Sequence, residues 1–412
     1  MPSLIKKVID TWKYEGAMAV LKKTKKYVFG KRLGSARQSF AKGTPIYDQY
    51  KFVLGRVRRG GEIDGEPKPK TVNWVVPDLG APGAGGHLTI FRCIKYLEEH
   101  GCHNRIYFHN VMGGDTKEAV KNIYERHYKN VAGDDAEIFS VHTEKMEPAE
   151  AVFATSWQTA YYVRDIKNCR RKFYFVQDFE PCFFPQGSEY FFAENTYKWG
   201  FVGIAASPWL KGRLEKGYGM KCYDFGFSFN KDIYYPRDVE RKKNQVLFYA
   251  RPSTARRAFE LAMLAFEIVS EKMPDVHFVF VGGGIKGNYD LPFDYEDAGI
   301  VSPDKLPDYY SSSRICVALS GSNVSLMPLE VMGCKSVLLS NDDEQVRWLV
   351  NEHNAILAHM DPMDIAEKIC YYLTHPSELE KIREAGYEYA QKTSWDDEYG
   401  KVLKALEKEL GQ

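Results

Sequence analysis

Two arginines stand where a predicted strand meets a predicted helix in the second half of the chain. Arg251 directly follows the apolar run Val246–Ala250, which is typical of a strand buried on both faces. Arg257 comes six residues later, at the start of a helix predicted to run to Lys272. A guanidinium group offers paired donors to phosphate oxygens, and a helix N-terminus adds N–H groups. The pattern favours a diphosphate site over solvated arginines, because cations there oppose the helix dipole.

Glycines follow the next predicted strand, His277–Val281. Gly282–Gly287 matches the spacing G-x-G-x-x-G, but the loop Asn288–Pro292 follows where a dinucleotide-binding motif needs a helix. We therefore expect Gly282 and Gly283 to let a base or a ribose lie against bare backbone.

A glycine-rich loop also follows the first predicted strand, Val72–Val76. It leads through Gly85, Gly86 and His87 into a helix that Gly101 closes. Backbone N–H groups at such a turn let an anion approach closely. The glycine spacing differs from the dinucleotide fingerprint, and no acidic residue stands where it would hold a ribose. The loop predicts a phosphate or sugar site, or a tight turn that needs glycine for backbone reasons alone.

Phe173–Val176 is a predicted buried strand that delivers Gln177, Asp178 and Glu180 at its carboxyl end. Ligands of open α/β sheets bind beyond that end. The carboxylates and neighbouring phenylalanines suit a sugar, whose hydroxyls bind carboxylates and whose apolar faces pack on aromatic rings. The other interpretation is a buried Phe cluster with solvated acids. Asp178 is our candidate for the carboxylate that orients or deprotonates an attacking hydroxyl.

Strands and helices alternate along most of the chain, which is typical of parallel sheets built from βαβ units. The polar stretch 230–244 separates two such series. We predict α/β domains over residues 71–235 and 236–395, and a final helix over 396–412 that packs back on the first domain. Further strands are predicted at Arg105–His109, Glu137–Val141, Ala151–Thr155, Ile300–Val301, Ile315–Leu319 and Ser336–Ser340.

Residues 1–70 are predicted to form a basic helical extension and a linker. Over residues 1–30, apolar side chains recur at helical spacing and lysines fall largely on the other faces. Such a helix either lies on an anionic membrane or docks on the protein's own surface with its lysines solvated. Residues 31–70 are rich in Gly, Pro and charge, which predicts a linker.

The composition limits the classes of function. A chain of 412 residues exceeds what one core supports, and its net charge of +1 offers no overall field to nucleic acid. Residues 1–60 hold 15 Lys and Arg against 3 Asp and Glu, whereas the rest holds 41 against 52. The eight Cys show neither a Cys-x-x-Cys nor zinc spacing, which favours a reducing cytoplasm. The sequence predicts neither a signal peptide nor a membrane span.

The two predicted Rossmann-like domains, facing a cleft, resemble the GT-B glycosyltransferases, and the second half resembles glycosyltransferase family 4. In that family an Arg and a later Lys hold the donor diphosphate, and Arg251 and Arg257 match these positions. Glu330 matches the second Glu of the family's E-x7-E motif, which binds the donor ribose, whereas Ser322 replaces the first. The catalytic candidates are Asp178 and Glu330. The donor-binding candidates are Arg251, Arg257, Gly282, Gly283, Val301, Ser325, Leu326 and Glu330.

The first half is similar to the rhamnosyltransferases of rhamnan and S-layer glycan assembly, through Pro77–His87 and Val176–Pro181. The resemblance implies a donor, dTDP-β-L-rhamnose, and a lipid-linked oligosaccharide acceptor. It implies no cofactor, no metal, and retention of the anomeric configuration. Acceptor or phosphate contacts are assigned to Gly85, Gly86, His87, Gln177 and Glu180. The expected location is the cytoplasm, with peripheral contact to the inner face of the membrane through residues 1–30. The sequence leaves open whether the chain forms a homodimer.

Three other functions stay open at this point. A nucleotide-sugar 2-epimerase of the same fold would convert the donor without any acceptor. A catalytically inactive glycan-binding protein would bind glycan without consuming donor. An NAD-dependent oxidoreductase is disfavoured by the mismatched glycine motifs at Gly80–His87 and Gly282–Gly287.

Overall fold

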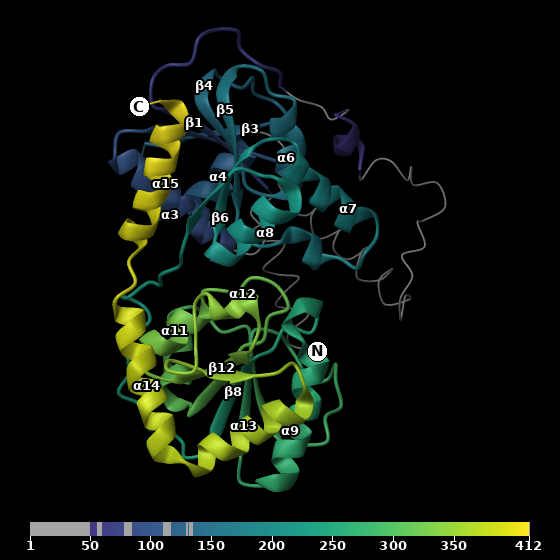
Figure 1. Cartoon of the computed structure of the whole chain (residues 1–412), viewed down its shortest axis with the longest axis vertical. Coiled ribbons are helices and arrows are strands. Elements are labelled where there is room, and N and C mark those ends of the chain that lie inside the picture. Colours follow the sequence, from purple (N-terminus) through teal and green to yellow (C-terminus); the bar gives the residue numbers. More distant parts are fainter. Residues whose placement is uncertain are drawn as a thin grey trace.

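The chain forms two α/β domains that are stacked along its long axis (Figure 1). The computed structural model describes residues 50–55, 60–77, 85–109, 117–128, 131 and 135–411. The predicted helix over residues 1–30 and most of the predicted linker lie outside the described residues. Among the described residues before the first sheet is the 3-10 turn η1 (Lys51–Leu54).

The first domain is built on a seven-stranded sheet in which every neighbouring pair of strands is parallel. The strand order is β3-β2-β1-β4-β5-β6-β7, so the direction of winding reverses between β1 and β4. The strands are β1 (Thr71–Val76), β2 (His103–Phe108), β3 (Glu137–Ser140), β4 (Ala149–Ala154), β5 (Cys169–Val176), β6 (Val202–Ala206) and β7 (Cys222–Phe225). The helices include α3 (Gly85–Glu99), α4 (Lys117–His127), α6 (Trp157–Arg164), α7 (Ser188–Asn195) and α8 (Pro208–Tyr218).

The second domain repeats this plan with a six-stranded parallel sheet in the order β10-β9-β8-β11-β12-β13. Its strands are β8 (Gln245–Tyr249), β9 (His277–Val281), β10 (Tyr295–Gly299), β11 (Ile315–Val317), β12 (Val337–Asn341) and β13 (Ile356–Ala358). Its helices are α9 (Phe259–Lys272), α10 (Leu306–Ser312), α11 (Met327–Gly333), α12 (Glu344–Arg347), α13 (Pro362–Thr374) and α14 (Pro376–Gln391). The prediction of two Rossmann-like domains is therefore confirmed.

The predicted strand at Ile300–Val301 is wrong. The strand lies just before it, at Tyr295–Gly299, and Ile300 is 86% exposed. β10 is an edge strand of polar sequence whose register shifts between Asp297 and Gly299. The Asp297 carboxylate accepts N–H groups of Ile285 and Lys286, which ties the strand to the preceding loop. An edge strand held by such side-chain bonds does not need a run of apolar residues. A prediction based on apolar runs therefore placed the strand at Ile300–Val301 instead.

Aromatic side chains stack across the central strands of the first sheet. Trp74 on β1 lies 4.1 Å from Phe153 on β4, between ring centroids, and Phe153 lies 4.7 Å from Phe173 on β5. All three are fully buried. Helices cover both faces of a doubly wound sheet, which is why its central strands β1 and β4 and the second half of β5 are buried along their length. This packing fixes the carboxyl end of β5, where Gln177 and Asp178 begin.

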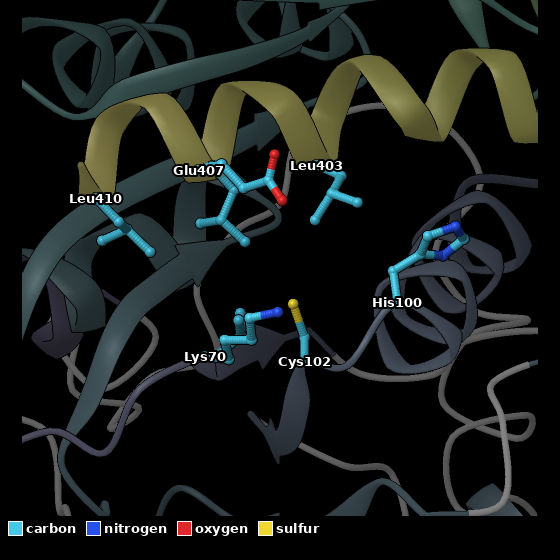
Figure 2. A pocket seen from close by; sticks show the side chains of 8 residues that line it. Lys70, His100, Cys102, Leu403, Glu407 and Leu410 are labelled. Atoms are coloured by element: carbon cyan, nitrogen blue, oxygen red, sulfur yellow. The ribbon is translucent and has the colours of Figure 1, made fainter. Parts of the chain in front are cut away.

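The last helix, α15 (Trp395–Leu410), leaves the second domain and lies along the first, beside α3 (Figure 1). Its Glu409 carboxylate forms ion pairs with Arg171 and Lys221 and accepts a hydrogen bond from Tyr223 at 2.7 Å. A small pocket remains between α15 and the amino ends of β1 and β2 (Figure 2). Its lining residues are Lys70, Val72, His100, Cys102, Leu403, Leu406, Glu407 and Leu410.

In the part of the chain that the structure describes, the backbone passes from one domain to the other before β8 and before α15. Among the described residues, no helix has the length and apolar character needed to cross a bilayer.

Candidate active site

The carboxyl edges of the two sheets meet where the domains touch. In the second sheet the winding reverses between β8 and β11, which are hydrogen-bonded neighbours. Ligands of doubly wound folds bind beyond the strand ends at such a switch point. Two segments leave the sheet there, the arginine turn (Arg251–Arg257) after β8 and the 320–326 loop after β11. The amide of Gly321 donates to the carbonyl of Arg256 at 2.7 Å, so these segments are joined directly.

Three guanidinium groups gather in the arginine turn. Arg251 donates from Nη1 to the carbonyl of Gly282 at 3.0 Å. Arg256 reaches across to the first domain, where its Nε lies 3.7 Å from Asp178 Oδ2 and its guanidinium carbon lies 4.1 Å from the centre of the Phe183 ring. The sequence predicted Arg257 in the first turn of the helix that follows. The structure instead places it in the 3-10 turn η4 (Ala255–Arg257), before α9 begins. The chain enters α9 only after Ala258, which adopts φ of 48°.

Arg257 carries positive charge that its surroundings do not neutralise. No described residue accepts a hydrogen bond from its guanidinium group. Burial, and then the charge of Arg256, lower the pKa of Arg257, while Asp178 opposes that shift. Arg251 adds a third cation to the same field. Since a partly buried charge is costly without a partner, the arrangement favours an anionic ligand.

Gly282 and Gly283 are needed because the backbone of the arginine turn runs against them. A Cβ on Gly282, where φ is 108°, would meet the Tyr249 ring at 2.9 Å. A Cβ on Gly283 would meet the carbonyl oxygen of Ala250 at 3.1 Å and Pro252 at 3.2 Å. The two glycines therefore let β9 and the arginine turn approach closely, and Gly282 also accepts the hydrogen bond from Arg251.

Asp178 lies at the boundary and is held mainly by the second domain. Its Oδ2 accepts the hydroxyl of Ser322 at 2.9 Å, and its Oδ1 accepts the amide of Asn323 at 2.8 Å. Its Oδ1 also accepts the N–H of Phe179 at 2.7 Å. Burial raises the pKa of Asp178, against the opposing effects of the Asn323 amide, Arg256 and Ser322.

Asn323 is the centre of this boundary. Its side-chain Nδ2 donates to the carbonyl oxygens of Gln177 at 2.8 Å and Ala206 at 2.6 Å, which end β5 and β6. Its Oδ1 accepts the indole N–H of Trp348 at 3.0 Å. Every polar atom of this buried side chain is thus used, and two of its three bonds cross between the domains.

The first turn of α3 faces the same place. A Cβ on Gly85 would lie 3.7 Å from Leu326 Cδ1, and one on Gly86 would lie 3.5 Å from the side chain of Gln177. These glycines therefore bring the start of α3 against the 320–326 loop. The His87 ring packs beside Phe91 instead, at 6.5 Å between ring centroids. Residues 78–84 of the predicted glycine loop lie outside the described residues.

Glu330 lies on α11, and its principal neighbours are Arg92 of α3 and Tyr234 of the interdomain segment. Burial raises the pKa of Glu330 to about 7, while Arg92 and the hydrogen bond with Tyr234 oppose the shift. The predicted ribose carboxylate therefore lies between the two domains, but the arginine turn is not its main charged neighbour.

Glu180 lies inside the first domain. Its Oε2 accepts the Trp157 amide at 2.5 Å and the Tyr174 hydroxyl at 3.0 Å, and only 6% of the residue is exposed. Burial raises the pKa of Glu180 to about 8, despite the two hydrogen bonds. These contacts make Glu180 a support for the segment that carries Asp178.

The structure brings together most of the residues predicted for a site. Arg251, Arg257, Asp178 and Gln177 lie around the 320–326 loop, which contains Ser325 and Leu326. Glu180 and His87 pack within the first domain, whereas Val301 is partly buried against the main hydrophobic core. Sequence reasoning missed Arg256 and Asn323. The run Arg256-Arg257 was a signal for the first, but a lone Asn in a Ser- and Gly-containing loop gives none.

Family models match both halves of the chain. A model of the WsaF C-terminal domain matches residues 244–370, and a model of the WsaF N-terminal domain matches residues 86–206. The two matches together cover more than half of the chain.

One relative by sequence is the O-antigen biosynthesis protein RfbC of Myxococcus xanthus, which is 27% identical over 370 residues. The alignment covers 86% of this chain but 28% of RfbC, so the chain spans little more than a quarter of that protein.

Solved structures with a similar fold include three proteins. Sucrose-phosphate synthase from Thermosynechococcus elongatus has a TM-score of 0.61 at 12% identity, with 82% of this chain and 98% of that one covered. HepE from Anabaena has a TM-score of 0.62 at 14% identity, with 82% and 99% covered. TarM from S. aureus has a TM-score of 0.64 at 10% identity, with 82% and 99% covered. At these identities the likeness shows the fold, which is that of two facing α/β domains.

Proposed function

We propose that this chain, which belongs to the WsaF family of GT-B glycosyltransferases, transfers L-rhamnose from dTDP-β-L-rhamnose to a growing, lipid-linked glycan chain. The observation that carries the proposal is the arginine turn, where three guanidinium groups lie at the switch point of the second sheet and two of them, Arg256 and Arg257, act on the Asp178 carboxylate. The motifs that resemble rhamnan-assembling rhamnosyltransferases support rhamnose as the sugar.

The donor diphosphate would lie between the arginine turn and the 320–326 loop. Arg251 and Arg257 would bind its oxygens, and the backbone at Ser325 and Leu326 would add N–H donors. When the bond to the sugar breaks, negative charge grows on the diphosphate, and cations already in place stabilise it without reorganisation. In this proposal arginines supply the positive charge, so transfer requires no metal ion.

Glu330 would bind the ribose of the donor. Because its pKa is raised to about 7, the carboxyl group is partly protonated at neutral pH and can both donate and accept a hydrogen bond. The nucleotide base would lie near Val301, on the same side of the sheet as Gly282 and Gly283.

The acceptor hydroxyl would approach from the first domain. Asp178 would orient it, and with retention of configuration the departing phosphate would take its proton. Phe183 is 40% exposed and lies against the guanidinium of Arg256, so its ring offers an apolar face to a sugar. These groups support a glycan acceptor beside the diphosphate.

The relatives support the same chemical class. RfbC is named for O-antigen biosynthesis, and the HepE structure was determined with UDP and glucose. We infer from them a nucleotide-sugar donor and a polysaccharide product. The basic residues 1–30 would hold the enzyme near a lipid-linked acceptor at an anionic membrane.

A thermal-shift panel with dTDP, UDP, GDP, ADP and NAD, each with and without EDTA, tests this proposal. A ligand at a hundred times its Kd adds about 2.7 kcal/mol to the free energy of unfolding. We expect dTDP to stabilise the protein equally with and without EDTA. Stabilisation by NAD alone, or loss of the dTDP effect in EDTA, would contradict the proposed donor site. Release of dTDP from dTDP-rhamnose that depends on added glycan would then distinguish transfer from epimerisation or simple glycan binding.

A further inference from the structure

We propose that Asn323 is a positioning residue, which pins the 320–326 loop to the first domain and so holds Asp178 beside the diphosphate site. The inference rests on the proposed function, because it assigns Asn323 a role in the same site. It concerns a contact between domains rather than a contact with substrate.

The first observation is the direction of the Asn323 hydrogen bonds. Its side chain comes from the second domain, but its amide donates to the carbonyl oxygens that end β5 and β6 of the first, at 2.8 and 2.6 Å. Trp348 fixes the orientation of the amide by donating to its oxygen. Only 2% of the residue is exposed, so water does not compete for these bonds.

The second observation is that the same residue holds Asp178. The main-chain N–H of Asn323 donates to Asp178 Oδ1 at 2.8 Å, and the neighbouring Ser322 hydroxyl donates to Oδ2 at 2.9 Å. Side chain and main chain of one residue therefore fix two consecutive positions of the first domain, Gln177 and Asp178. A displacement of the loop would move the carboxylate as well.

The third observation is backbone strain at the residue after Ala206. Ser207 is fully buried and has φ of 132° and ψ of 152°, a region that residues other than glycine seldom adopt. Its hydroxyl accepts the amide of Leu210 at 3.0 Å and so caps α8. Strain of this kind persists only where the surrounding structure enforces it, and here it adjoins the carbonyl that Asn323 binds.

These contacts have a kinetic consequence for a transferase. Arg251 and Arg257 lie in the second domain and do not need Asn323 to bind a diphosphate. Asp178 belongs to the first domain and needs the pinned loop to reach the same site. Because the charged diphosphate contacts come from the arginine turn and only the Ser325 and Leu326 amides come from the loop, removing the pin should slow the reaction much more than it weakens nucleotide binding.

The test uses Asn323→Asp, which keeps the size and the acceptor for Trp348 but places a carboxylate oxygen against the two carbonyl oxygens. We expect amide hydrogen exchange of the 320–326 segment, measured on the ligand-free protein by mass spectrometry, to quicken at least about tenfold. We expect kcat with dTDP-rhamnose to fall about 10- to 100-fold, with KM for the nucleotide sugar within about threefold of the parent.

Asn354→Asp is the matched control. Asn354 is also a buried Asn of the second domain, but its Oδ1 accepts the Asn351 amide at 2.8 Å within that domain. A carboxylate can accept the same bond, so exchange at residues 320–326 and kcat should stay at parent values. If Asn323→Asp does not fold, Trp348→Phe removes the indole N–H that orients Asn323 and keeps an aromatic ring against Phe227, and it should change exchange and kcat in the same direction by less.

The outcomes separate the inference from the proposed function. Unchanged exchange in Asn323→Asp would show that the loop is not pinned, whatever the donor is. Faster exchange with unchanged kcat would leave Asn323 a purely structural contact and overturn its positioning role. An equal loss in nucleotide affinity and kcat would place Asn323 in the donor site instead. A parent enzyme that does not consume dTDP-rhamnose would contradict the proposed donor, while the exchange comparison would still decide whether the loop is pinned.

Discussion

The arginine turn holds more positive charge than its protein neighbours neutralise. Arg256 is paired with Asp178, whereas no described residue accepts a hydrogen bond from the guanidinium of Arg257. Such a group is stable only if the gain on binding an anion exceeds the cost of keeping it partly buried. The arrangement therefore favours an anionic ligand at the arginine turn.

Asp178→Asn is expected to slow transfer about 100-fold, because the amide cannot orient or polarise the acceptor hydroxyl as a carboxylate does. The amide oxygen can still accept from Ser322 or Asn323, so the domains should stay joined. Steady-state kinetics, with dTDP affinity measured by calorimetry, check this expectation. Full activity would remove Asp178 from the reaction, and a matching loss of dTDP affinity would move it to the donor side.

Glu180→Gln is expected to remove a pH dependence of folding. The pKa of Glu180 is raised by burial to about 8, so the native state holds a proton that the unfolded chain releases above its ordinary pKa of 4.5. The stability it contributes is full below pH 4.5 and is lost as the pH rises through 8. Between pH 6 and pH 9 the parent should lose about 2–3 kcal/mol relative to Glu180→Gln.

Urea unfolding of the two proteins at both pH values measures that difference. Glutamine keeps an acceptor for the Trp157 amide and the Tyr174 hydroxyl, so the fold should survive. If the free energy of unfolding changes with pH by the same amount in parent and variant, Glu180 is already ionised in the native protein, and the expectation is wrong.

The arginines of the candidate site were easier to predict from the sequence than its uncharged polar residues. Arg251 and Arg257 were predictable because guanidinium groups at a strand end have few other uses. Asn323 was not, because its role depends on which main-chain carbonyls of another domain lie opposite. In the sequence, Ser322 only stands where the E-x7-E motif has its first Glu. The structure adds that its hydroxyl donates a hydrogen bond to Asp178.

At the scale of elements, most strands were predictable because both sheets are parallel and covered on both faces. Continuous apolar runs then mark strands such as β5 and β8. The position of β10 was predicted wrongly because β10 is an edge strand that side-chain contacts hold in place. β13 (Ile356–Ala358) and α12 (Glu344–Arg347) were not predicted, since so few residues leave no measurable periodicity.

Glu409→Gln is expected to weaken the attachment of α15 to the first domain. Burial, which would raise the pKa of Glu409, is outweighed by bonds from Lys221, Tyr223 and Arg171, and its pKa falls to about 2. A lowered carboxyl pKa gives stability above the ordinary value of 4.5 that is lost as the pH falls towards 2.

The expected loss at pH 7 is about 1 kcal/mol, because Arg171 and Lys221 are about half exposed and solvent screens them. Thermal unfolding of parent and variant should therefore differ at pH 7 and converge as the pH falls through about 2. A difference that stays constant across this range would assign the effect to packing rather than charge. Glu407→Gln is the control on the same helix, at the pocket of Figure 2.

At the scale of the whole molecule, the two domains repeat one plan and turn their strand ends towards each other (Figure 1). That arrangement follows from the strand order, because a doubly wound sheet places its binding edge at the switch point. The alternation of strands and helices predicted two such domains, and the resemblance to GT-B glycosyltransferases implied that they face each other. The contacts that join the domains were not predictable, because they link segments that are more than a hundred residues apart.

Whether the arginine turn binds the donor diphosphate is decided by the affinity of dTDP for the parent protein and for Arg257→Ala, measured by calorimetry in EDTA. Arg241→Ala is the control, since Arg241 is also a partly buried arginine of the second domain but bonds to the carbonyl oxygens of Ser311 and Lys335. Loss of a charged hydrogen bond costs about 1.5–3 kcal/mol, so Arg257→Ala should weaken dTDP binding roughly 10- to 100-fold while Arg241→Ala binds as the parent does. Equal affinity in the parent and Arg257→Ala would show that the arginine turn does not hold the diphosphate, and the proposed donor site would have to be abandoned.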